Sequence, residues 1–231
     1  MKKLWLKVVL VVSLDGRIAP ANGEKAHIGG QGDREVLEEA LAWADATIMG
    51  GETLRVQKST CLIHKEALIQ KRIEKNKTKQ PIALVLSNKS DHSSDLEFFK
   101  QSIHRWLISS KITLDDFINI EGYERLIPFQ KDYASTLNEL YQIGLRKIVV
   151  LGGAQVIASL LKENQIDELQ LTISPQLLGG KYSWIPYEMN CLPINFNDPR
   201  IWKLKENKIL CNNEIMVKYI NSNSESYTQK E

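Results

Sequence analysis

Short apolar runs alternate with helical patterns along most of this sequence. The apolar runs predict strands at residues 4–14, 46–49, 82–86, 105–109, 147–151 and 167–174. Amphipathic periodicity predicts helices between them, at residues 33–44, 65–74, 132–144 and 154–161. This alternation is typical of α/β proteins, in which helices cover both faces of a mainly parallel sheet.

The C-terminal part of the sequence departs from this alternation. Residues 201–205 and 215–220 flank Asn212 and Asn213, a pattern that predicts an antiparallel hairpin at the sheet edge. The polar residues 222–231 are expected to form a disordered tail. Because the 231 residues contain no repeat and no long linker, residues 1–221 are expected to form a single domain. The expected fold is an α/β three-layer sandwich with a mostly parallel central sheet and an antiparallel C-terminal edge hairpin.

The composition excludes several classes of protein. Thirty Lys and Arg residues oppose 28 Asp and Glu residues, which leaves a formal net charge of +2. A protein that mainly grips nucleic acid needs a basic excess on one face, so no nucleic-acid partner is expected. The three cysteines and four histidines lack metal-ligand spacing, so neither a metal site nor a disulfide framework is expected. Sparse cysteine usage indicates a cytoplasmic protein.

The N-terminus has some features of a secretory leader, because Lys2 and Lys3 precede an apolar run. Lys7 interrupts that run, however, and Asp15 stands before the candidate cleavage site. The mostly β-branched residues 8–12 suit a buried strand and are too few to cross a bilayer, which takes about 20 residues. Neither a leader nor a membrane partner is therefore expected.

Two glycine pairs follow predicted strands, at the edge of the sheet where parallel sheets bind ligands. Gly50 and Gly51 follow the second predicted strand, and Gly152 and Gly153 follow the fifth. Glycine lets the backbone approach a ligand closely, and the following helix presents free N–H groups that suit a phosphate. Each pair is equally compatible with an ordinary tight turn, and neither matches a G-x-G-x-x-G or Walker A pattern.

Other side chains at this edge carry possible ligand chemistry. Thr53 could donate to a phosphate oxygen, and Arg55 could pair with a phosphate charge. Asp15 and Asp33 are the acids expected nearest the ligand edge, although each also suits a turn or a helix cap. No nucleophile elbow and no paired cysteine and histidine occur, so no catalytic residue is assigned.

Together these motifs resemble, in order and spacing, the reductase domain of riboflavin biosynthesis. The resemblance covers about residues 4–220 and rests on Ser13-Leu14-Asp15-Gly16-Arg17-Ile18-Ala19, Ala44-Asp45-Ala46, Gly50-Gly51-Glu52-Thr53, Gly152-Gly153, Asp167-Glu168-Leu169, Pro175 and Leu178-Gly179-Gly180. It implies a fold like that of dihydrofolate reductase and a homodimer. It also implies NADPH-dependent reduction of a ribosylaminopyrimidine 5′-phosphate to the ribitylamino compound. The zinc-binding deaminase half of the bifunctional family members is absent from this sequence.

The resemblance also implies which residues would bind the cofactor and the substrate. The expected cofactor-binding residues are Val11, Gly50, Thr53, Ser87, Gly152, Gly153, Ala154 and Gln155. The turn at Gly152 would cradle the pyrophosphate, the backbone of Val11 would border the nicotinamide, and Ser87 would lie near the adenosine ribose. The expected substrate-binding residues are Ser13, Asp15, Lys25, His27 and Arg55. Solvent can supply the proton.

Several positions depart from the family pattern, and they concern the substrate more than the cofactor. The first helix lacks an expected arginine, and uncharged residues replace a lysine, an aspartate and a glutamate at Val9, Gln57 and Leu151, respectively. Either other basic residues compensate, the candidates being Lys25, Arg34 and Arg55, or the substrate differs. The alternatives are a paralogous NADPH-dependent reductase of another pteridine-like or carbonyl substrate, and a nucleotide-binding protein without catalysis.

Overall fold

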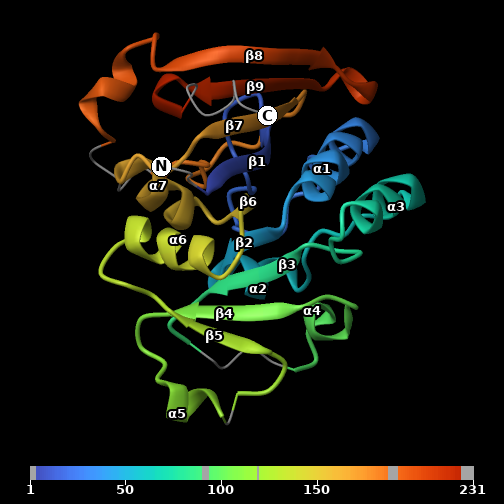
Figure 1. The fold of residues 1–231 in the computed structure, drawn as a ribbon. Coiled ribbons are helices and arrows are strands. Elements are labelled where there is room, and N and C mark those ends of the chain that lie inside the picture. The colour runs from blue at the N-terminus through green and yellow to red at the C-terminus, as the bar shows by residue number, and fades with distance from the viewer. Residues whose placement is uncertain (1–3, 90–93, 119, 187–191, 225–231) are drawn as a thin grey trace.

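The computed structural model describes residues 4–89, 94–118, 120–186 and 192–224. These residues form a nine-stranded sheet in the order β5-β4-β3-β2-β6-β1-β7-β9-β8 (Figure 1). The strands are β1 (Trp5–Ser13), β2 (Ala46–Gly50), β3 (Ile82–Leu86), β4 (Arg105–Ser109), β5 (Arg125–Pro128), β6 (Lys147–Gly152), β7 (Glu168–Ser174), β8 (Trp202–Ile209) and β9 (Ile215–Asn221). The pairs from β5 to β7 are parallel, whereas β9 pairs antiparallel with β7 and with β8.

Helices cover both faces of this sheet (Figure 1). They are α1 (Gln31–Trp43), α2 (Gly51–Gln57), α3 (Glu66–Glu74), α4 (Glu97–Lys100), α5 (Leu114–Phe117), α6 (Tyr133–Gln142) and α7 (Ala154–Lys162), with short 3-10 turns at Ile194–Asn197 and Cys211–Asn213. Val8 of β1 belongs to the core beneath α6 and α7, whereas Val9 packs beneath α1. Alternate residues of the central strand are thus buried on opposite faces, which confirms the predicted three-layer α/β fold.

The N-terminal cap of α1 differs from the prediction. The sequence suggested Asp33 as the cap, but the helix begins at Gln31 and Gly30 is the capping position. Glu214, which is buried beside β9, accepts hydrogen bonds from the backbone N–H groups of Gly30 at 2.6 Å and Asp33 at 3.1 Å. A distant carboxylate therefore caps this helix, and the side chain of Asp33 is released from that role.

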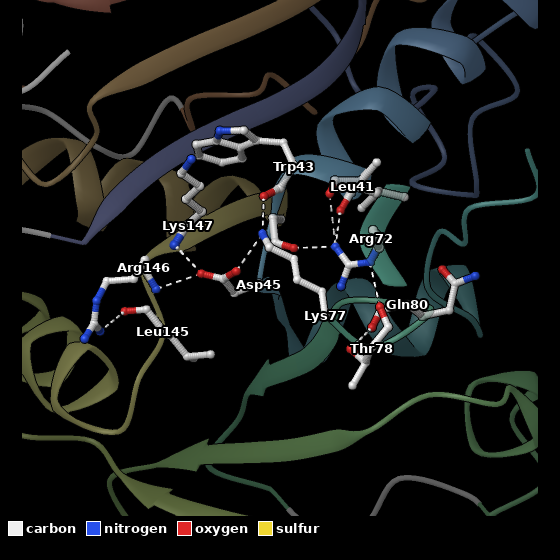
Figure 2. Close-up of polar contacts among 12 residues, drawn as sticks. Leu41, Trp43, Asp45, Arg72, Lys77, Thr78, Gln80, Leu145, Arg146 and Lys147 are labelled. Carbon is white, nitrogen blue, oxygen red and sulfur yellow. Dashed lines mark hydrogen bonds and ion pairs between the residues drawn. The ribbon is translucent and has the colours of Figure 1, made fainter. Parts of the chain in front are cut away.

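The inward face of α3 also differs from the prediction. The apolar residues of this segment predict an inward face of Leu68, Ile69 and Ile73, but Ile73 is 41% exposed and Arg72 is buried instead. The Arg72 guanidinium donates hydrogen bonds to backbone carbonyls at the C-terminal end of α1, including that of Ala44 at 2.5 Å (Figure 2). The last carbonyls of a helix lie beyond its regular hydrogen-bond ladder, so the buried arginine supplies donors to this helix end.

A second basic side chain joins the same network. Lys77 Nζ donates to the carbonyl of Trp43 at 2.7 Å and pairs with Asp45 Oδ1 at 2.7 Å. Asp45 Oδ2 accepts the backbone N–H groups of Arg146 and Lys147 at the start of β6 (Figure 2). These contacts tie α1 to the amino-terminal ends of β2 and β6, which is the edge of the sheet away from the glycine pairs.

The remaining sequence predictions for the fold are largely confirmed. The C-terminal hairpin forms the antiparallel edge, and Gly144, at φ 105°, ends α6 as expected. The tail was expected to be disordered from residue 222, but Ser224 is buried and its Oγ donates to Asp167 at 2.5 Å. Residues 225–231 lie outside the described residues. Within the described ranges, no helix is both long and apolar enough to cross a membrane.

Candidate functional site

The two glycine pairs lie against each other. β2 and β6 are neighbouring parallel strands, and Met49 is in register with Gly152. A Cβ atom placed on Gly50 would lie 3.7 Å from the backbone nitrogen of Gly153, and one placed on Gly153 would lie 2.6 Å from Thr53 Oγ1. The two corners therefore form one surface, and the absence of a side chain at Gly153 keeps Thr53 in contact with the backbone of the other corner.

The helix that follows the second corner starts at a glycine. Gly153 is the capping position of α7, and as a glycine it has no side chain to accept a hydrogen bond from the first turn. Ala154 and Gln155 begin this nine-residue helix, with Gln155 exposed and Ala154 half-buried. The first N–H groups of a helix carry a partial positive charge, so this end is suited to an anion. Thr53 adds a hydroxyl donor beside it.

A cavity of about 200 Å³ lies at the carboxyl ends of β3 and β4. Its lining residues are Leu86, Ser87, Asn88, Ile108, Ser109, Ser110, Phe129 and Tyr133. The Ser87 hydroxyl donates to the carbonyl of Lys89 at 2.8 Å and accepts its N–H at 3.1 Å, which closes a tight turn at the rim. The wall combines aromatic rings with hydroxyl groups, so it offers both apolar contact and hydrogen-bonding partners to a ligand.

Ser13 and Asp15, predicted to bind substrate, lie together at the end of β1. Ser13 Oγ donates to Asp15 Oδ1 at 2.5 Å, and the Asp15 carboxylate accepts the backbone N–H groups of Leu178 and Gly179 at 3.1 and 2.8 Å. The Ser13 hydrogen bond is the main cause that lowers the pKa of Asp15 to about 2, with the backbone donors adding to it. The pair therefore ties the end of β1 to the loop after β7.

The basic residues predicted to bind substrate are divided between two places. Lys25 and His27 are exposed in the segment between β1 and α1. Arg55 belongs to α2, at the first glycine corner, where it pairs with Glu52 at 2.9 Å. Arg34, a candidate substitute for the missing family charges, is exposed in the first turn of α1, and both it and Lys25 are within electrostatic range of Cys61.

One acidic residue near this edge has a perturbed environment that the sequence could not show. Asp33 is buried, and its side chain hydrogen-bonds with Thr172 of β7. Burial, together with the nearby charge of Glu214, raises the pKa of Asp33 to about 6, while the Thr172 hydrogen bond opposes the rise. Perturbed carboxyl groups are concentrated at functional sites, so Asp33 joins the candidate residues.

Metal-binding chemistry finds no support in the described part of the chain. There, no group of three or more His, Cys, Asp or Glu side chains lies close enough to hold a metal ion. Cys61 and Cys211 are free thiols, and Cys191 and His92 lie outside the described residues. The candidate site is thus formed by backbone corners, hydroxyls and charged side chains.

Solved structures with a similar fold include several reductases. A pyrimidine reductase-like protein from Corynebacterium diphtheriae has a TM-score of 0.76 at 18% identity, over 95% of this chain and 92% of its own. A deaminase/5-amino-6-(5-phosphoribosylamino)uracil reductase from Thermotoga maritima has a TM-score of 0.73 at 17% identity, over 95% and 57%. Dihydrofolate reductase from Enterococcus faecalis, complexed with NADP(H), has a TM-score of 0.53 at 12% identity, over 94% and 96%. The predicted dihydrofolate-reductase-like fold is confirmed.

Two curated relatives share sequence with most of the chain. The 2,5-diamino-6-ribosylamino-4(3H)-pyrimidinone 5′-phosphate reductase of Archaeoglobus fulgidus is 22% identical over 188 residues, which cover 78% of this chain and 84% of the relative. The riboflavin biosynthesis protein RibD of Haemophilus influenzae is 25% identical over 209 residues, 87% of this chain but only 55% of the relative. The chain therefore spans about half the length of that relative. Residues 4–209 match the family model described as the RibD C-terminal domain, and the chain belongs to that family.

Proposed function

We propose that this protein is an NADPH-dependent reductase of riboflavin biosynthesis, which converts a ribosylaminopyrimidine 5′-phosphate into the ribitylamino compound. The observation that carries the proposal is the contact between two glycine corners at neighbouring strand ends, in a member of the RibD C-terminal domain family. The archaeal relative named as a pyrimidinone 5′-phosphate reductase and the NADP(H)-bound structural neighbour support the same reaction class.

The glycine corner fits the pyrophosphate of a nicotinamide dinucleotide. The capping position of α7 is a glycine without a side chain, Thr53 offers a hydroxyl, and any side chain at Gly153 would collide with that hydroxyl. The backbone is therefore open to a ligand where donors converge. When bound, the reduced nicotinamide supplies the hydride for the reaction. The protein would hold the two reactants in contact and exclude water from between them.

The rest of the cofactor would extend along the sheet. The cavity beside Ser87, the glycine corner and Val11 follow one another across the strand order β3-β2-β6-β1. Three inter-strand spacings of about 4.8 Å give a span of about 15 Å, which an extended dinucleotide can cover. The adenosine would then occupy the cavity and the nicotinamide would lie at Val11. The turn formed by Ser87 and Lys89 is our candidate for recognition of the 2′-phosphate that distinguishes NADPH from NADH.

The substrate would bind beyond the nicotinamide, near β1 and β7. Ser13 and Asp15 shape that end through the contacts that hold the loop after β7. Lys25, His27 and Arg34 are exposed near the start of α1 and could neutralise the substrate phosphate in place of the missing family charges. Arg55, at the other corner, is better placed for the cofactor phosphates than for the substrate.

A consumption assay tests the proposed function. The purified chain is incubated with NADPH and each of two substrates, 2,5-diamino-6-ribosylamino-4(3H)-pyrimidinone 5′-phosphate and its deaminated uracil counterpart. Loss of NADPH absorbance with formation of the ribitylamino product from at least one of them is expected. NADPH binding without turnover of either pyrimidine would instead support the non-catalytic alternative.

The departures from the family pattern favour one second candidate. Val9, Gln57 and Leu151 stand where the family resemblance implies a lysine, an aspartate and a glutamate, so a paralogous reductase of another pteridine-like or carbonyl substrate is the alternative. Under this alternative, NADPH would bind as proposed. It would be consumed in the presence of a compound from a set of pteridines and carbonyl compounds, but not in the presence of the pyrimidine phosphates. The same assay therefore separates the candidates.

We also propose that residues 1–221 act as a single reductase domain, in the cytoplasm and as a homodimer. One continuous sheet from β5 to β8 supports the single domain. Sedimentation equilibrium of the purified protein tests the homodimer, because a monomer mass at micromolar concentration would contradict it. Fractionation of cells that express the protein tests its location.

A further inference from the structure

The edge strand β8 carries apolar and charged side chains on opposite faces of the sheet. Its pairing with β9 assigns Leu204 and Ile209 to one face, and Lys203, Glu206 and Lys208 to the other. A strand with this alternation normally turns its apolar side chains toward a covered surface. The residues Leu204 and Ile209 are nevertheless 53% and 88% exposed.

These two residues extend an apolar face that begins in the core. The register of four strands aligns two rows of side chains, which are Val8, Leu169, Tyr219 and Leu204, and Val12, Ile173, Ile215 and Ile209. Val8 and Leu169 belong to the core beneath α6 and α7. α7, however, packs against β2 and β6, and Ile215 of β9 is 44% exposed. The face is therefore covered at the centre of the sheet and open at β9 and β8, which form its margin (Figure 1).

The charges of the hairpin are engaged on the other side of the sheet, the side of α1. Glu206 pairs with Lys218 at 2.6 Å and with Lys208 at 2.9 Å. The open side of the hairpin presents the uncharged residues Leu204, Asn207, Ile209, Ile215, Val217 and Tyr219. A surface of this kind is complementary to a copy of itself, because neither copy brings a charge that the contact would have to desolvate.

Two further leucines add apolar surface at the carboxyl end of this face. Leu14 follows β1 and is 61% exposed, and Leu177 follows β7 and is 76% exposed. The N–H of Leu14 donates to the carbonyl of Gln176 at 2.8 Å, so the two leucines are held by neighbouring backbone segments. The exposed apolar side chains thus lie next to one another rather than scattered over the molecule.

The free edge of β8 is poorly suited to pairing with another strand. The register with β9 shifts between Leu204 and Glu206, which leaves Lys205 at the irregularity. Lysine side chains and bulges on an edge strand prevent further strands from adding to a sheet. A second copy would therefore contact the face of this hairpin and not its edge.

The size of the face is appropriate for a dimer contact. Three inter-strand spacings of about 4.8 Å and seven residues at about 3.3 Å each give a face of about 14 Å by 23 Å, from β1 to β8. An apolar patch of a few hundred Å² is the size that marks interaction sites. It would form the apolar core of an interface of about 800 Å² per partner, to which a polar rim contributes the rest.

We propose that the face formed by Leu204, Ile209 and Ile215 is the surface through which two copies of this chain associate. The assignment rests on the homodimer proposed above and names its interface, whatever the reaction. Each copy would contribute the same patch across a two-fold axis, and the two sheets would pack face to face about 10 Å apart.

The substitution Ile209→Lys tests this surface. The lysine would remain in water in the monomer, because Ile209 is already 88% exposed there, but its charge would be buried without a partner in the dimer. The Kd of the dimer should rise by at least about 100-fold. Sedimentation equilibrium over a series of protein concentrations measures this Kd, and circular dichroism verifies that the variant is folded.

Ile118→Lys is the matched control. It makes the same change at an isoleucine that is 81% exposed, between β4 and β5 at the opposite edge of the sheet. The control should dimerise like the wild type. If folded Ile209→Lys also dimerises like the wild type, the assigned surface is wrong while the homodimer stands. A monomeric wild type would overturn both, and neither result bears on NADPH consumption.

Hydrogen exchange locates the surface without any substitution. The wild-type protein is diluted from well above to well below the Kd of its dimer, and amide exchange is followed by mass spectrometry. Exchange should become faster in β8 and β9 and stay unchanged in β5, the other edge strand. Faster exchange in β5 alone, or no change in β8 and β9 while the mass falls to that of a monomer, would overturn the assignment.

Discussion

Thr53 is the side chain that connects the two glycine corners. Its Oγ1 would lie only 2.6 Å from a Cβ atom placed on Gly153. We propose that this hydroxyl donates a hydrogen bond to the cofactor pyrophosphate, in addition to packing against the backbone. Packing and hydrogen bonding can be separated because valine has nearly the shape of threonine but lacks the hydroxyl.

The substitution Thr53→Val should weaken NADPH binding by about 10-fold or more, since a hydrogen bond to a charged group contributes about 1.5–3 kcal/mol. Thr53→Ser is the matched control, because it keeps the hydroxyl and should bind NADPH nearly as well as the wild type. Calorimetric titration of each variant gives the Kd. If valine and serine weaken binding equally, the hydroxyl has no donor role.

Asp33 gives a pH dependence whose sign follows from its pKa. In the folded protein this pKa is about 6, above the ordinary value of 3.8, so the folded state holds the proton more tightly than the unfolded chain does. Its contribution to stability is present below pH 4 and is lost as the pH rises through 6. Glu214 is the charged group that acts on Asp33. Asp33, Lys25 and Arg34 in turn all act electrostatically on the neighbouring Cys61 thiol.

We therefore expect Asp33→Asn to raise the free energy of unfolding at pH 7, where the buried carboxyl group must ionise. A shift of about 2 pKa units corresponds to about 3 kcal/mol, which is an upper value for the gain. The difference between variant and wild type should vanish near pH 4. Urea denaturation at several pH values measures this difference in the free energy of unfolding. A difference that does not change with pH would show that the pKa of Asp33 is not raised in the folded protein.

The helices and strands were predictable where burial is one-sided or complete. The valine-rich run of β1 and the apolar stripe of α7 both appear in the structure close to their predicted bounds. β5 was not predicted, because Arg125–Pro128 has four residues, with an exposed arginine and proline at its ends. Such a strand is recognisable only from its pairing with β4, which is tertiary information.

Contacts between distant parts of the chain account for the other differences. Glu214 caps α1 from 181 or more residues away, and Arg72 is buried because it reaches carbonyls of another helix. Local periodicity cannot reveal either partner. The glycine corners of the site were recognisable from strand ends, but the environment of Asp33 depends on Thr172 and Glu214, which local sequence does not connect to it.

Arg72 gives a prediction at the level of secondary structure elements. Arg72→Met should lower the free energy of unfolding by about 2–4 kcal/mol, because carbonyls at the C-terminal end of α1 would lose the donors that the buried guanidinium supplies. Lys71→Met, an exposed change on the same helix, should have almost no effect. NADPH affinity should be unchanged in both folded variants, since this network lies at the opposite edge of the sheet from the glycine corners. Chemical denaturation and NADPH titration together check this expectation.

At the scale of the whole molecule, the strand order determines how the candidate site residues are arranged. The cavity beside Ser87, the glycine corner, Val11 and Asp33 occur in sequence along one edge, from β3 to β7. We propose that these residues, which are far apart in the chain, form one track for a dinucleotide and its reaction partner. In parallel sheets the carboxyl ends of the strands share one edge, so this arrangement follows from the topology.

The central claim is that the two glycine corners form one binding site for a reduced nicotinamide dinucleotide. The most direct test is calorimetric titration of NADPH into the wild-type protein and into Gly153→Ala, with circular dichroism to verify that the variant is folded. We expect one saturable site per chain in the wild type, weakened about 5- to 100-fold by the added methyl group, since overpacking typically costs about 1–3 kcal/mol. No heat with the wild type, or equal affinity in the folded variant, would contradict it.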